Sequence, residues 1–143
     1  MPKSYLIAIT QHTQECLEDL NELSKIAKQR PFNRIERRAA ERALQVLIEA
    51  GIGVAKYWLK SCRKNIPLDA YDSFNKLAEM GKLSIDELKQ WRKIIGMRNA
   101  LVHDYLTIDD ELLQALLSEQ AYQFLVDFIM QAKSQLDDGC DWP

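Results

Sequence analysis

The feature that most constrains this chain is a helical repeat of apolar residues that continues almost unbroken through its first 62 residues. Apolar side chains recur every three or four positions from about residue 4 to 29, and again from about residue 31 to 62. Pro31 separates the two stretches, and its fixed φ suits the start of a helix. Two helices of this length must bury their apolar stripes against other helices, so the chain is expected to form a helical bundle.

Two shorter helices are expected next. One spans about residues 69–80 and ends at Gly81, a residue type suited to a helix C-terminus. The other opens at Ser84, which forms a capping-box pattern with Glu87. A sheet is disfavoured, because only 5 Gly and 4 Pro are available for its turns.

A last helix is expected to start near the acidic pair Asp109-Asp110 and to extend to about Leu136. The sequence therefore predicts an all-α bundle of about five helices, two of them long. A length of 143 residues fits a single domain over residues 1–143. Residues 137–143 are expected to form a flexible acidic tail.

Two glycines interrupt the second long helix. Gly51 and Gly53 lie in its middle, where each costs up to about 1 kcal/mol relative to alanine. A phosphate-binding loop is excluded here, because the third glycine is missing and no strand precedes the pair. The glycines instead predict a close approach of another helix or a local bend.

The charge is distributed unevenly. Residues 1–64 hold 12 Lys and Arg against 7 Asp and Glu, whereas residues 65–143 hold 7 against 14. Such a basic excess is able to attract phosphates, although a solvated helix face with pairs such as Arg37–Glu41 is an equally good interpretation. The excess comes mainly from seven cations that face only Glu36 and Glu41: Lys25, Lys28, Arg30, Arg34, Arg37, Arg38 and Arg42.

Several classes of protein are disfavoured. The N-terminus lacks a signal-peptide core, and the most apolar stretch, residues 43–59, contains Gln45, Glu49 and Lys56 and falls short of a membrane span. The three cysteines are too far apart for a metal knuckle. We therefore expect a cytoplasmic protein with no membrane association, no metal site and no cofactor.

The residues best suited to chemistry are concentrated between Arg98 and Tyr105, with Asn99 and His103 between them. Histidine exchanges protons near neutral pH, and arginine stays charged and binds phosphate oxygens through a fork of N–H groups. A structural interpretation is also open, in which Arg98 binds a carboxylate and Tyr105 packs against the bundle. The other histidine, His12, is expected at the surface.

Helical geometry separates these residues into two stripes. At about 100° per residue, Arg98 and Tyr105 lie about 20° apart, and Asn99 and His103 stack one turn apart. Arg98 and His103 are about 140° apart on one straight helix. Either the helix unwinds near His103, or two copies of the chain meet and build a composite cleft.

The segment Arg98-Asn99-Ala100-Leu101-Val102-His103-Asp104-Tyr105 resembles the R-x4-H-x-Y signature of HEPN proteins in the HepT toxin group. Residues 40–50 and 74–81 support the resemblance, which extends over essentially the whole chain. It implies a helical bundle that forms a homodimer, with two Arg-x4-His motifs across a shared cleft, and metal-independent endoribonuclease activity. It also implies a small nucleotidyltransferase antitoxin of the MntA kind, which attaches AMP to the motif tyrosine, here Tyr105.

The residue types fit the activity that the resemblance implies. His103 would act as general acid and base on the RNA substrate, and Arg98 would stabilise the phosphate charge of the transition state. Asn99 would support one of them, and Tyr105 would be the point of control. Two other functions remain open: a non-catalytic HEPN partner that holds a nucleotidyltransferase, and a purely structural helical adaptor.

Overall fold

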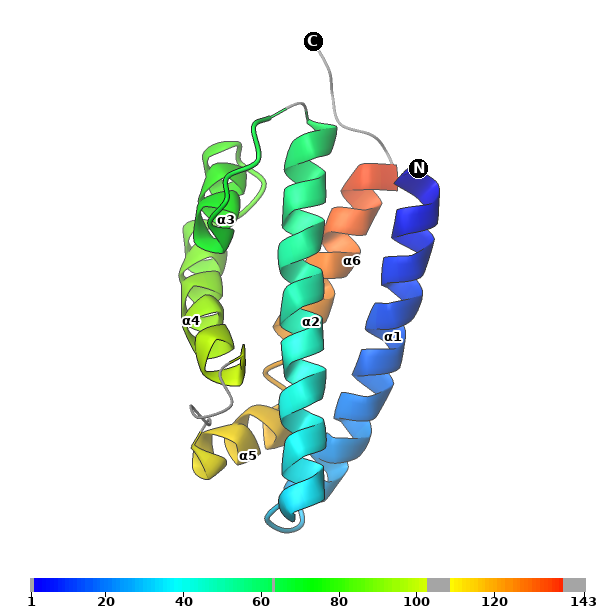
Figure 1. The fold of residues 1–143 in the computed structure, drawn as a ribbon, viewed down its shortest axis with the longest axis vertical. Helices are drawn as coiled ribbons and strands as arrows, with labels where there is room; N and C mark the ends of the chain where they lie inside the picture. The colour runs from blue at the N-terminus through cyan, green and yellow to red at the C-terminus, as the bar shows by residue number, and fades with distance from the viewer. Residues whose placement is uncertain (1, 63, 103–108, 138–143) are drawn as a thin grey trace.

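The computed structural model describes residues 2–62, 64–102 and 109–137, and all regular structure within them is helical (Figure 1). The two long helices run antiparallel, the α3–α4 hairpin lies on one side of α2, and α6 returns along α1 and α2. The prediction of an all-α bundle is confirmed. The helices are α1 (Pro2–Ala27), α2 (Arg34–Ser61), α3 (Ala70–Glu79), α4 (Ile85–Val102), α5 (Asp110–Ser118) and α6 (Gln123–Asp137).

The second long helix begins at Arg34 rather than at Pro31, because a capping box at Asn33 sets its start. The Asn33 side chain accepts from the Glu36 backbone N–H at 2.8 Å, and Glu36 accepts from the Asn33 N–H at 2.9 Å. Arg30 adds a two-bond fork to the same carboxylate. The hydrogen bonds that the Glu36 carboxylate accepts, those from Arg30 foremost and then the one from the Asn33 N–H, lower its pKa to about 2.

The expected ends of the shorter helices are confirmed. Gly81 has a positive φ of 77°, which suits a residue that follows a helix C-terminus. Ser84 and Glu87 form the reciprocal capping box, with bonds of 3.1 and 3.0 Å. Both helix ends are therefore set by residues close to them in sequence, as the sequence predicted.

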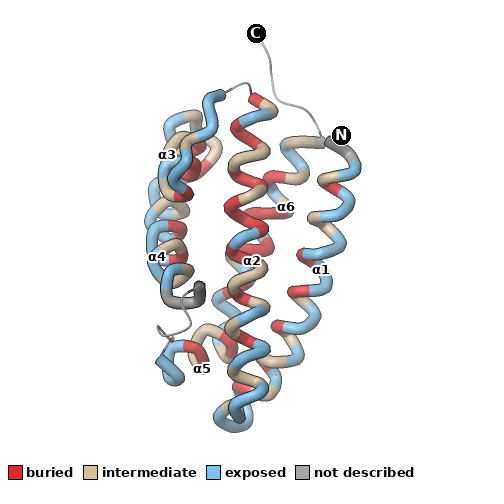
Figure 2. Tube along the Cα trace, in the orientation of Figure 1, coloured by how far each residue is buried: buried red, intermediate tan, exposed pale blue. Residues whose placement is uncertain are grey.

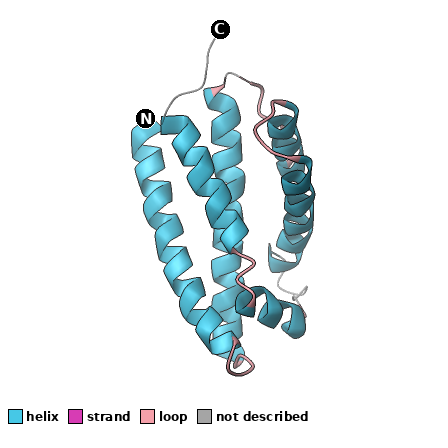
Figure 3. Ribbon diagram, turned by 180° about the vertical axis from the view of Figure 1, so that it is seen from behind, coloured by secondary structure: helices cyan, strands magenta, loops and turns pink. Residues whose placement is uncertain are grey.

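The expectation of one continuous helix from about residue 109 to 136 is wrong. The chain turns between α5 and α6, so the described residues hold six helices rather than about five (Figure 3). Gln120 adopts a positive φ of 56°, and the buried Tyr122 beyond it donates to Asn21 Oδ1 of α1 at 2.7 Å. A tertiary contact thus stabilises the break. Asp137 is the last residue of α6, and residues 138–143 of the expected tail lie outside the described residues.

The core surrounds α2, which carries buried residues at intervals from Ala40 to Leu59 (Figure 2). Trp91 of α4 is fully buried and stacks on Phe74 with ring centres 4.0 Å apart. A Cβ added to Gly51 would lie only 2.6 Å from Trp91 Cη2, which confirms the expected close approach of helices at this glycine. Within the described residues, no helix is both long and apolar enough to cross a membrane.

Candidate functional site

Arg98 lies on the side of α4 that faces α2. The buried residues Trp91 and Ile94 precede it by seven and four positions, so all three follow one stripe of the helix. Trp91 packs against α2 at Gly51, and this contact fixes the rotation of α4. The core therefore positions Arg98 at the surface of α2.

On α2, Arg98 meets Glu49. Its Nε donates to Glu49 Oε1, and its Nη2 donates to Oε2 at 3.3 Å. The side chains are 31% and 42% exposed, so the ion pair is in contact with solvent. Arg98 therefore does bind a carboxylate, as one interpretation of the sequence expected. The other edge of its guanidinium has no protein partner among the described residues.

The remaining motif residues divide between described and undescribed parts of the chain. Asn99 is exposed and lies about 100° around α4 from Arg98. His103 and Tyr105 lie outside the described residues, and the expected unwinding of the helix at His103 falls on the same segment. Of the four motif residues, the structure therefore describes only Arg98 and Asn99.

Glu49 also borders a surface groove between α1 and α2 with a volume of about 330 Å³. Tyr5 and His12 line it from α1, and Arg42 and Gln45 line it from α2. His12 is exposed, as expected. The groove reaches the Arg98 site through Glu49, which belongs to both.

Glu49 is the residue of the site that sequence reasoning missed. It stands in the most apolar stretch of the chain, residues 43–59, where a charge is conspicuous. That position could have marked it as a residue with a specific partner. Its partner, Arg98, is 49 residues away in sequence, so a pattern of neighbouring residues could not have predicted the pair.

The basic cluster separates into two sets. Arg30 is paired with Glu36, and Arg37 donates to Asp110 of α5 at 2.9 Å rather than pairing with Glu41. Arg34, Arg38 and Arg42 are exposed, and no ion pair is recorded for them within the described ranges. The bundle thus uses part of the cluster and leaves three arginines available on α2.

A metal site finds no support in the part of the chain that is described, where no three His, Cys, Asp or Glu side chains gather. The group of this site with the chemistry to bind a phosphate is the Arg98 guanidinium, through the edge that Glu49 does not occupy.

Comparison with protein-family models matches residues 13–132 to the family described as ribonuclease HepT-like. The chain belongs to the HepT-like ribonuclease family. Membership confirms the family inferred from the R-x4-H-x-Y segment and assigns the chain to a group of ribonucleases. No curated protein matches the sequence.

Solved structures of low sequence identity share the fold. A toxin–antitoxin crystal structure with AMP-PNP matches with a TM-score of 0.79 at 20% identity, covering 91% of this chain and 98% of that one. A tri-AMPylated Shewanella oneidensis HEPN toxin in complex with MNT antitoxin matches with a TM-score of 0.79 at 21% identity, covering 91% and 97%. The bundle of this HepT-like chain therefore has the same fold as these two structures.

Proposed function

We propose that this HepT-like chain is the metal-independent endoribonuclease toxin of a type VII-like toxin–antitoxin pair, acting as a single cytoplasmic domain over residues 1–143. The observation that carries the proposal is the placement of Arg98, which the core of α4 holds at a solvent-accessible position on α2. The family assignment supports RNA as the substrate.

The proposed chemistry is attack of an RNA 2′-hydroxyl on the adjacent phosphorus, with loss of the 5′-oxygen. His103 takes the proton of the 2′-hydroxyl and returns one to the leaving oxygen, since its ordinary pKa lies near ~6.5. Arg98 offsets the charge that develops on the phosphate oxygens, and Asn99 orients the phosphate or His103. No cofactor is needed for these steps.

The Glu49 contact is compatible with this role for Arg98. Guanidinium has five N–H donors in a planar fork, and Glu49 occupies only the Nε and Nη2 side. The opposite edge remains able to bind a phosphate, while the carboxylate fixes the plane of the group. Glu49 is thus a positioning residue for Arg98.

A homodimer is part of the proposal. Arg98 and His103 would point about 140° apart on a straight helix, so one copy of the motif does not converge on a phosphate unaided. A second copy of the chain would supply the complementary half of a shared cleft.

Control by AMP addition at Tyr105 completes the proposal. Support comes from the HEPN toxin of the same fold that is tri-AMPylated and in complex with an MNT antitoxin. Each AMP brings a phosphate anion beside the Arg-x4-His segment, and a bound anion there competes with RNA for Arg98. The proposed partner is therefore an MntA-like nucleotidyltransferase antitoxin.

His103→Ala tests the nuclease proposal. We expect wild-type protein to degrade RNA in excess EDTA and the variant to lose at least about 100-fold of that activity, because proton transfer is removed. RNA integrity on gels and growth after expression are scored together. Equal activity of the two proteins would refute the role of His103, and loss of wild-type activity in EDTA would refute metal independence.

Tyr105→Phe tests the control site. With ATP and the cognate nucleotidyltransferase, intact mass of the wild type is expected to rise by whole AMP units, while the phenylalanine variant stays unmodified because it lacks the accepting hydroxyl. The variant should still cleave RNA, which serves as its folding control. Modification of the variant to the same extent would exclude Tyr105 as the acceptor.

A non-catalytic HEPN partner of a small nucleotidyltransferase is the second candidate. The Arg98–Glu49 pair favours it to the extent that Arg98 already has an anion. In that case purified protein would bind the nucleotidyltransferase yet leave RNA intact, with or without EDTA.

A further inference from the structure

Arg34, Arg38 and Arg42 of α2 follow one another at intervals of four residues on the surface that leads to Arg98. At about 100° and about 1.5 Å per residue, the three lie within an arc of about 80° and rise about 6 Å at each step. Gln45 and Glu49 continue within the same arc. The row therefore ends at the residue that holds Arg98.

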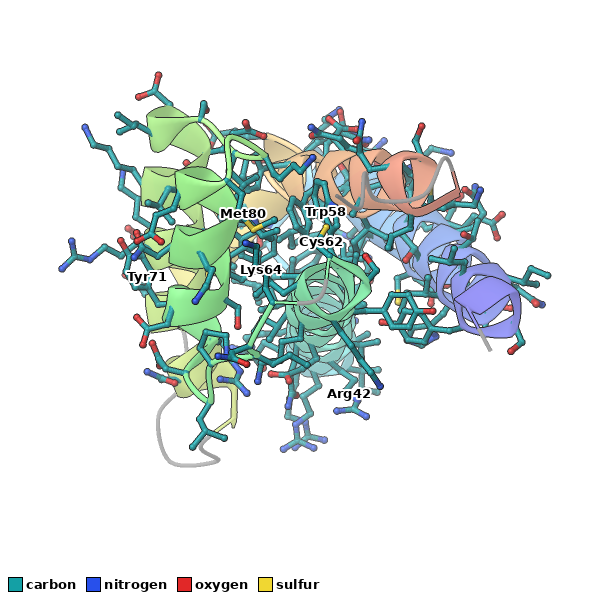
Figure 4. The ribbon with its side chains drawn as sticks, turned by 90° about the horizontal axis from the view of Figure 1, so that it is seen from above. Arg42, Trp58, Cys62, Lys64, Tyr71 and Met80 are labelled. Carbon is teal, nitrogen blue, oxygen red and sulfur yellow. The ribbon has the colours of Figure 1, made fainter. Side chains whose placement is uncertain are left out.

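The three side chains point into solvent. All are exposed, and Figure 4 shows Arg42 on the side of α2 away from Trp58, projecting outward from the bundle. Within the part of the chain that the structure describes, the only side-chain hydrogen bond of these three arginines joins Arg42 Nη1 to Gln45 Oε1 at 3.4 Å, which is long. Nothing in the packing of the described residues requires these charges.

The acids near the row do not neutralise it. Glu36 is engaged by Arg30, and Glu49 is engaged by Arg98. Glu41 is partly buried beside Arg38 and forms no recorded ion pair in the described structure. Three uncompensated cations at regular spacing are suited to a polyanion with regularly spaced charges.

We propose that the row Arg34, Arg38 and Arg42 binds the phosphate backbone of single-stranded RNA and leads it along α2 to the Arg98 site. The inference rests on the proposed function for its substrate and adds the surface that the RNA follows. Arg42 stands seven residues before Glu49, or about 10 Å along the helix, so RNA contacting the row extends several nucleotides beyond the cleaved bond. The contact is independent of base identity, since arginines on a solvated helix face reach phosphates rather than enclosed bases.

Arg34→Gln/Arg38→Gln/Arg42→Gln is the test variant, with Lys89→Gln/Arg92→Gln/Lys93→Gln as its control. The control removes the same charge from exposed positions of α4 that lie about 120–180° around the helix from Arg98. Both sets are introduced into His103→Ala protein so that RNA is bound and not consumed. Anisotropy of a labelled single-stranded oligoribonucleotide is measured across a salt series in EDTA.

The row variant is expected to bind RNA at least about 10-fold more weakly. The negative slope of log K for RNA association against log salt is expected to become shallower by about 2, or about 0.7 for each lost phosphate contact. The control should keep the slope and affinity of the parent. An Arg34→Lys/Arg38→Lys/Arg42→Lys protein should retain most of the binding, which separates lost charge from lost fold. Unchanged binding by the glutamine variant, or equal loss in the α4 control, would overturn the proposal.

Cleavage by the row variant with His103 intact separates this inference from the proposed nuclease. We expect cleavage of long RNA to show a raised KM, while a dinucleotide too short to reach the row is cleaved as by the wild type. If no protein cleaves RNA yet the row still governs binding, the nuclease proposal fails and the binding surface stands. If RNA binding is unchanged but capture of the nucleotidyltransferase is lost, the row is a protein interface and the proposal is wrong.

Discussion

Arg98→Ala is expected to lower kcat/KM for RNA in EDTA by at least about 100-fold, because it removes the charge that we propose stabilises the developing phosphorane. Its effect on stability should be small. The Arg98–Glu49 pair is partly exposed, and such pairs contribute about 1 kcal/mol or less. The measurement is cleavage kinetics beside thermal unfolding of the same preparation. If the Arg98→Ala variant cleaved RNA as fast as the wild type, Arg98 would have no role in the mechanism.

Glu49→Gln is the matched comparison. It keeps the shape of the partner and leaves Arg98 charged, so the loss of kcat should be under about 10-fold and much smaller than for Arg98→Ala. Arg98→Lys should fall between the two, since lysine retains the charge but not the planar fork that Glu49 orients. If Glu49→Gln were as inactive as Arg98→Ala, Glu49 would have a direct role rather than a positioning one.

Mixing the inactive Arg98→Ala and His103→Ala proteins tests whether the site is shared between copies. In a random mixture, a cleft built from one arginine and one histidine of different chains would recover about a quarter of the wild-type activity. Sites built within one chain would recover none. Sedimentation of the wild type as a monomer would likewise argue against a shared cleft.

Most of the fold could be predicted because its determinants are local. The helical period, the Ser84–Glu87 capping box and the glycine that follows α3 all act within a few residues, and each appears in the structure as expected. The break between α5 and α6 could not be predicted. No Gly or Pro marks Gln120, and the turn depends on the contact of Tyr122 with Asn21, 101 residues away in sequence.

The candidate site shows the same division. The motif made Arg98 a candidate from sequence, but its orientation depends on Trp91 packing against α2, and its partner Glu49 lies on another helix. The basic cluster could not be resolved either. Neighbouring Arg37 and Arg38 look equivalent in sequence, yet only Arg37 reaches Asp110 of α5 and is used by the fold.

Trp91→Ala is expected to lower the free energy of unfolding by about 3–5 kcal/mol, which is a large part of the roughly 5–15 kcal/mol that stabilises a domain. The ring is fully buried, stacks on Phe74 and meets the edge of Phe128 with centroids 5.2 Å apart. Urea denaturation measures the loss. A change below about 1 kcal/mol would mean that the core does not depend on this side chain.

Gly51 supplies the sharper form of the same test. A Cβ there would lie 2.6 Å from Trp91 Cη2, so Gly51→Ala should destabilise the protein even though alanine is the better helix former. Gly53→Ala is the matched control, because its Cβ would meet only Tyr5 Oη at 3.4 Å. In Trp91→Ala protein the ring is gone, so Gly51→Ala should there cease to destabilise and should fill part of the cavity. If Gly51→Ala lowered the free energy of unfolding equally in both backgrounds, the glycine would not be needed for the approach of α4. The packing of Trp91 on Gly51 would then no longer explain the orientation of Arg98.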